Sequence, residues 1–126
     1  MIAADSSAMI SYFDGKKSLA TERIDEALFN HNLIMPPVVL SELLSDPNLS
    51  KKHFDQISLL PTLEIKEGYW QRSGLMRSKL IAKKLKARLA DVLIAQSCID
   101  YDISLIAIDA DFRHFKKHCG LKLFEF

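Results

Sequence analysis

Acidic side chains follow two apolar runs that are far apart in the sequence. Asp5 comes directly after residues 2–4, and Asp109 directly follows residues 103–108, with Asp111 one residue further on. If both runs are parallel strands, these acids arrive at the carboxyl edge of the sheet, where open α/β sheets bind their ligands. Carboxylates that share a site repel one another unless some are protonated or a cation lies between them. Their oxygen atoms favour Mg²⁺ or Mn²⁺ as that cation.

Two further acids lie in apolar helical patterns. Asp91 opens the segment ADVLIAQSCI, which has almost no polar face, so its carboxylate either caps the helix or enters a buried polar site. Glu42 lies in VVLSELL, at the edge of an apolar helical face. Asp5 and Asp109 are also good candidates for helix N-caps, and Glu42 for an ordinary solvated residue. Taken one at a time, these acids leave a structural role and a functional role open.

Positive charge is concentrated in one stretch of the chain. The net charge is only +1, but no acid occurs between Gly68 and Ala90. Such a segment can contact the phosphates of a polyanion such as RNA, or it can be the solvated face of a helix. The seven cations of this candidate RNA-binding segment are Arg72, Arg77, Lys79, Lys83, Lys84, Lys86 and Arg88.

The elements that position these residues follow from hydrophobic periodicity. Short apolar runs alternate with helical patterns in a chain of 126 residues, which predicts a single α/β domain built from βαβ units. We expect strands at residues 2–4, 33–35, 63–65, 103–108 and 121–124. Helices are expected at residues 7–13, 18–30, 50–58, 68–85 and 88–101, and over VVLSELL after Pro36 and Pro37.

The sequence argues against a membrane-spanning, secreted, disulfide-rich or zinc-binding protein. No apolar run is long enough to span a membrane, and the first residues lack the pattern of a secretory signal, so we expect a cytoplasmic protein with no membrane partner. Cys98 and Cys119 are too few for a disulfide scaffold and lack zinc-site spacing, which makes them packing residues. His114 and His118 have a zinc-compatible spacing, but no pattern provides a third ligand.

Four blocks of the sequence, in order, resemble a PIN-domain ribonuclease of the VapC toxin type. They are AADSSAMISYF, PPVVLSELLS, RLADVLIAQSCIDYDISLIAIDADF and HCGLKLF. The resemblance spans residues 1–126 as one PIN domain, and implies a PIN-like α/β fold with a central, mostly parallel sheet of about four to five strands flanked by helices. Asp5, Glu42, Asp91 and Asp109 match the acidic quartet of that family, and Asp111 matches the second acid of its closing D-x-D-F block.

This resemblance implies a Mg²⁺- or Mn²⁺-dependent endoribonuclease, the toxin of a type II toxin–antitoxin pair. Its partners would be an RNA substrate, a small VapB-like antitoxin and a second copy of the chain in a homodimer. The quartet would be catalytic, with Asp5, Asp91 and Asp109 as metal ligands and with Ser6 and Asp111 in support.

One departure from the family pattern keeps a second interpretation open. The family usually has Thr or Ser two residues before the fourth acid, where this chain has Ala107, and it more often has Thr at the position of Ser6. A serine hydroxyl can replace that of threonine, but alanine has none. The alternative is therefore a catalytically weak or inactive PIN-fold module that binds RNA or forms a complex.

Overall fold

Two short parallel strands form the centre of the molecule. The computed structural model describes residues 1–126. Strand β1 (Ile2–Ala4) pairs in parallel with β2 (Ser104–Ile106), with Ile2 opposite Ser104 and Ala4 opposite Ile106. Almost every side chain of this pair is buried. The prediction that residues 2–4 and the run before Asp109 form parallel strands is confirmed, although β2 covers only three residues of the predicted strand 103–108.

The sheet continues on both sides of this pair through single parallel bridges. Ile2 bridges to Leu33 and Leu105 bridges to Leu123, while a further bridge joins Met35 to Thr62. The segments predicted as strands at 33–35, 63–65 and 121–124 therefore lie near the expected places, but each is too short to form a regular ladder. Proline explains part of this, because the Pro36-Pro37 pair follows Met35 directly and has no N–H groups to donate.

Seven helices surround the strands. Three of them begin at serine or aspartate N-caps whose side chains accept a backbone N–H of the first turn. The predicted helix 68–85 ends earlier, because Lys84 adopts a left-handed backbone conformation with φ of 59° that does not continue a helix. The helices are α1 (Ser6–Phe13), α2 (Leu19–Phe29), α3 (Pro37–Leu44), α4 (Lys51–Ser58), α5 (Tyr69–Ala82), α6 (Leu89–Tyr101) and α7 (Phe112–Cys119).

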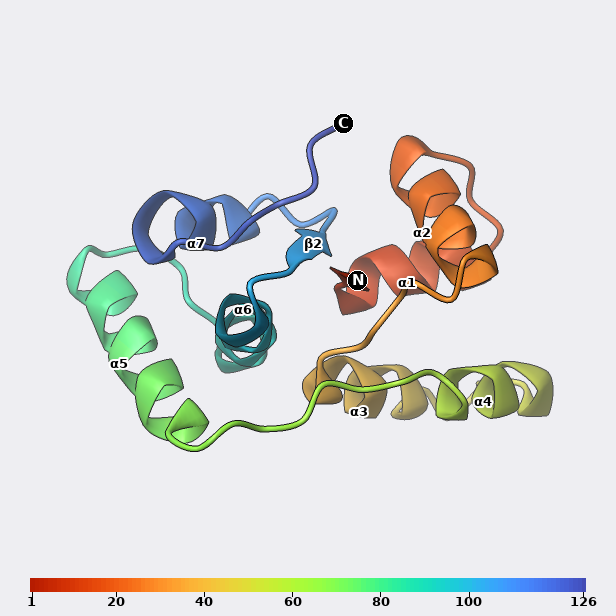
Figure 1. The fold of residues 1–126 in the computed structure, drawn as a ribbon, viewed down its shortest axis with the longest axis horizontal. Helices are drawn as coiled ribbons and strands as arrows, with labels where there is room; N and C mark the ends of the chain where they lie inside the picture. Colours follow the sequence, from red (N-terminus) through yellow and green to blue (C-terminus); the bar gives the residue numbers. More distant parts are fainter.

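Helix α6 lies near the middle of the molecule, with α5 and α7 at one end and α2 and α4 at the other (Figure 1). Its side chains Val92, Ile94, Ala95 and Cys98 are fully or almost fully buried, which agrees with a helix that is apolar nearly all round. No helix is long and apolar enough to cross a membrane. The architecture is the expected PIN-like α/β fold with helices around a parallel sheet, although only two of the expected four to five strands form a ladder and the other segments join through single bridges.

Candidate active site

Asp5 is the most deeply buried acid of the chain. It follows β1 and is the N-cap of α1, where its side chain accepts hydrogen bonds from the backbone N–H of Ala8 and from the Ser7 hydroxyl, both at 2.9 Å. Only 3% of the residue is exposed. Burial raises the pKa of Asp5 to about 6 against the opposing effect of these two hydrogen bonds, and the charges of Asp91 and Asp109 raise it further. Asp5 is thus a helix cap and a member of an acidic cluster at once.

Asp91 joins this cluster from the first turn of α6. The N-cap of α6 is Arg88, and no side-chain hydrogen bond caps the helix, so the capping interpretation of Asp91 does not hold. Burial raises the pKa of Asp91, and the charge of Asp109 raises it further, while Arg88 lowers it. Smaller repulsions come from Glu42 and Asp111. The fold therefore brings the predicted acids close enough to act on one another.

Glu42 reaches the cluster from α3 and lies at its exposed rim. The Ser6 hydroxyl donates a hydrogen bond of 2.6 Å to Glu42 Oε1, although the two residues are 36 positions apart in the sequence. This contact fixes the orientation of the Glu42 carboxylate from the first turn of α1. Ser6 therefore contacts an acid of the cluster, and its supporting role in catalysis stays a prediction.

Asp109 and Asp111 have different partners despite their spacing. Asp109 Oδ1 accepts the backbone N–H of Asp111 at 2.9 Å, so it organises the turn between β2 and α7 instead of capping α7 directly. Asp111 occupies the N-cap position of α7 without a side-chain cap, and its Oδ2 forms an ion pair of 3.2 Å with Lys86 Nζ. Asp109 thus remains available to the acidic cluster, whereas the charge of Asp111 is largely compensated.

The chemistry of the donors in this cluster fits a hard divalent cation. All of its candidate ligands are carboxylate or hydroxyl oxygens, and a cation would offset the burial and the neighbouring charges that together raise the pKa of Asp5 and Asp91. No three histidine, cysteine or acidic side chains converge closely enough, as they stand, to hold one ion together. The ligand set of Asp5, Asp91 and Asp109 therefore remains a proposal.

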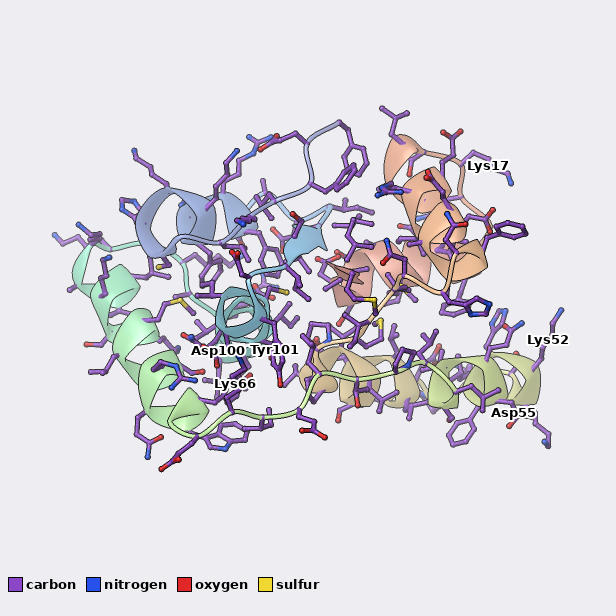
Figure 2. The ribbon with its side chains drawn as sticks, in the orientation of Figure 1. Lys17, Lys52, Asp55, Lys66, Asp100 and Tyr101 are labelled. Carbon is purple, nitrogen blue, oxygen red and sulfur yellow. The ribbon has the colours of Figure 1, made fainter.

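The predicted RNA-binding cations divide into engaged and free side chains. Arg72 donates from both Nε and Nη2 to the Asp100 carboxylate, at 3.1 and 2.6 Å. Asp100 lies beside Lys66 and Tyr101 at the opposite end of α6 from Asp91 (Figure 2). This ion pair joins α5 to α6, so we no longer include Arg72 among the RNA-binding residues.

The other cations of that segment have different contacts, and only Lys86 and Arg88 act on acids of the cluster. Arg77 Nε donates to the carbonyl of Ala87 at 2.9 Å, which ties α5 to the turn before α6. Lys79 and Lys86 have partners on or beside α7. Lys83, Lys84 and Arg88 are exposed and form no ion pair. Sequence reasoning also missed Ser7 as a hydrogen-bond donor to Asp5, although its place two residues after an N-cap is a usable indication.

Two hollows of about 450 Å³ each lie beside α1, one between α1, α2 and α4 and the other between α1, α3 and α4, where it reaches the rim of the acidic cluster. Phe13 and His53 line both, and Glu42 lines the hollow nearer to the acids. We refer to the two together as the α1–α4 groove. Ile10, Tyr12, Phe13 and Leu28 provide apolar side chains to this groove, whereas Met9, next to Ile10, is fully buried in the core.

Comparisons with known proteins agree with this architecture. The family model for the PIN domain matches residues 2–118. No curated protein matches the chain significantly. Among solved structures, the chain is similar to VapBC2 from Rickettsia felis, solved bound to a DNA fragment from its promoter, with a TM-score of 0.76 and 20% identity over 100% of this chain and 99% of that one.

It is also similar to VapBC-5 of Mycobacterium tuberculosis, a member of the VapBC family of toxin–antitoxin systems. The TM-score is 0.71 and the identity 17%, over 99% of this chain and 98% of that chain. Identities this low show a shared fold and no more. The family match covers nearly the whole sequence, however, and the chain therefore belongs to the PIN domain family.

Proposed function

We propose that this PIN domain is a divalent-metal-dependent endoribonuclease and the toxin of a type II toxin–antitoxin pair. One observation carries the proposal: Asp5, Glu42, Asp91 and Asp109 come from four separate parts of the chain, and burial together with the neighbouring carboxylates raises the pKa of Asp5 to about 6 and also raises that of Asp91. The repulsion among these carboxylates opposes folding. Repulsion of this kind is common at functional sites, where a ligand relieves it.

Asp5, Asp91 and Asp109 would hold Mg²⁺ or Mn²⁺, which when bound supplies an acidified water and neutralises phosphate charge during hydrolysis of a phosphodiester. The chain's own residues position the other groups. Ser6 orients Glu42 at the rim, where a carboxylate can accept a proton. Asp111 and Lys86 fix the turn that presents Asp109, and the exposed Arg88 lies where it can contact a phosphate beside Asp91.

The proposed partners follow from the α1–α4 groove and from the related structures. Both similar structures are of VapBC toxin–antitoxin systems, and we propose a small VapB-like antitoxin for this chain, acting in the cytoplasm. The groove offers apolar side chains from α1 next to the acidic cluster. An amphipathic segment with a basic residue at one end would match both features. A homodimer is part of the same proposal.

The deciding experiment is cleavage of tRNA, rRNA and mRNA by the purified protein with Mg²⁺ or Mn²⁺, with and without chelator. We expect metal-dependent cleavage by the wild type and none by Asp5→Asn. Asp55→Asn is the matched control, because it makes the same chemical change at an exposed position on α4, far from the acids (Figure 2). Equal cleavage by wild type and Asp5→Asn would refute the nuclease proposal.

Ala107 supports the second candidate function, a PIN-fold module that binds RNA without cutting it. Ala107 lies between β2 and Asp109 and provides no hydroxyl for water or carboxylate. RNA binding by the wild type in the presence of metal, without cleavage of any RNA class, would favour this module. Retention of all the acids argues for the nuclease.

A further inference from the structure

A second acid-free basic segment follows Asp111 in the chain. Residues 112–124 contain Arg113, Lys116, Lys117 and Lys122, with His114 and His118, and no acid. With seven cations in residues 68–90 and four here, the two segments hold eleven of the 17 Lys and Arg residues and none of the 16 acids. The net charge of +1 therefore conceals a strong separation of charge between these segments and the rest of the chain.

The fold places the two segments against each other. Helices α5 and α7 are in contact at the same end of the molecule (Figure 1). Lys79 Nζ on α5 donates a hydrogen bond of 2.6 Å to the carbonyl of His118 at the end of α7. Partial desolvation lowers the pKa of His118, and the charges of Lys83, Lys117 and Lys79 lower it further. Lys79, Lys83 and Lys117, which lie around His118, thus form one positively charged area, the α5–α7 surface.

This surface is continuous with the acidic cluster. Lys86, in the turn between α5 and α6, pairs with Asp111 at the start of α7. Helix α7 has eight residues, so it carries positive charge about 12 Å away from the acids. A strand of RNA that leaves the acidic cluster along α7 would place more than one phosphate over these cations.

Helix stabilisation alone does not explain the α5–α7 surface. Cations in the last turn of a helix interact favourably with its dipole, which accounts for part of the charge of α7. Lys116 and Lys122 also have acidic partners, Glu125 and Asp102. Lys79, Lys83 and Lys117 have no acidic partner. Lys79 and Lys83 lie at the end of α5, and only Lys117 belongs to α7. Their mutual repulsion is useful only if a polyanion binds there.

We propose that the α5–α7 surface binds the phosphates of the RNA strand whose cleavage occurs at the acidic cluster, so that the substrate extends several nucleotides beyond the cut. The identity of this polyanion as RNA rests on the proposed function. The surface lies at the opposite end of the molecule from α2 and α4, so an RNA strand and an antitoxin in the α1–α4 groove would approach the acids from different sides (Figure 1).

Binding of a labelled single-stranded RNA, measured with chelator across a salt series, tests the proposal without cleavage. The test variant is Lys83→Glu with Lys117→Glu. The control is Lys16→Glu with Lys52→Glu, two exposed lysines near α1 and on α4 that form no ion pair. Loss of two phosphate contacts should weaken RNA binding about tenfold and reduce the slope of log affinity against log salt by about 1.4. The control should change neither quantity.

Three outcomes would overturn the proposal: an affinity and salt slope like those of the control, no RNA binding by the wild type, or tighter binding of duplex DNA than of RNA through the same lysines. If circular dichroism shows that the double variant is unfolded, Lys83→Gln with Lys117→Gln replaces it. Glutamine removes the two charges without reversing them, so the expected losses of RNA affinity and salt slope are smaller. Cleavage is measured separately. A nuclease whose RNA affinity is insensitive to these lysines refutes only the surface, and lysine-dependent binding without cleavage refutes only the nuclease.

Discussion

Asp5 offers a direct test of the candidate site, because burial disfavours the ionised form of its carboxyl group. Asp5→Asn removes that charge and keeps the shape of the side chain. The asparagine oxygen can still accept the N–H of Ala8, and the Ser7 hydroxyl can turn to accept from the new amide. We therefore expect Asp5→Asn to stabilise the protein in the absence of metal at pH 8, although the same change should abolish cleavage.

The direction and size of this effect follow from the pKa of Asp5. In the unfolded chain the carboxyl ionises near its ordinary value of 3.8, and in the folded protein its pKa is about 6. The folded state binds the proton more tightly, so this group contributes stability below about pH 4 that is lost as the pH rises through about 6. Two pKa units correspond to at most about 3 kcal/mol of unfolding free energy. For a chain of this length that is a shift in Tm of about 10 °C.

Thermal unfolding with chelator at pH 4 and pH 8 measures this effect. We expect Asp5→Asn to have a higher Tm than the wild type at pH 8 and a similar Tm at pH 4. Asp55→Asn should show no such pH-dependent gain, because Asp55 is exposed and pairs only with Lys51. Mg²⁺ should raise the Tm of the wild type at pH 8 more than that of Asp5→Asn. An Asp5→Asn protein no more stable than the wild type at pH 8 would refute the reasoning from burial.

Three other substitutions test separate parts of the site. Ser6→Ala removes the hydrogen bond that orients Glu42, and should reduce kcat for RNA cleavage about tenfold while costing about 1 kcal/mol or less in unfolding free energy. Ala107→Thr restores the hydroxyl usual in the family and should increase kcat; an unchanged rate would mean that cleavage does not need it. Arg72→Met removes the ion pair to Asp100 and leaves the Gln96 amide as the remaining side-chain hydrogen bond of that carboxylate, so it should lower the Tm by about 5 °C and leave RNA affinity unchanged, whereas an affinity loss would return Arg72 to the RNA-binding set.

The sequence was sufficient to predict where the acids would meet. Asp5 and Asp109 follow apolar runs, and parallel pairing of those runs requires both acids to leave the sheet at one edge. Periodicity did not predict that most of the other strand segments pair at a single residue, because ladder length depends on neighbours that lie far away in the chain. The same limit applies to Arg72. Its charge is visible in the sequence, but its partner is 28 residues away on another helix.

Tertiary contacts also explain why two aspartates can stand one residue apart at the end of a buried strand. Asp109 accepts the N–H of Asp111 and keeps its remaining acceptor capacity for the acidic cluster. Asp111 turns to Lys86, a cation from the basic segment between α5 and α6. The pair therefore links the acids to the α5–α7 surface, and the two charges are not directed at the same point. Replacing Lys86 would leave Asp111 uncompensated beside Asp91, whose pKa its charge already raises. The basic segment thus supports the acidic cluster as well as any RNA bound next to it.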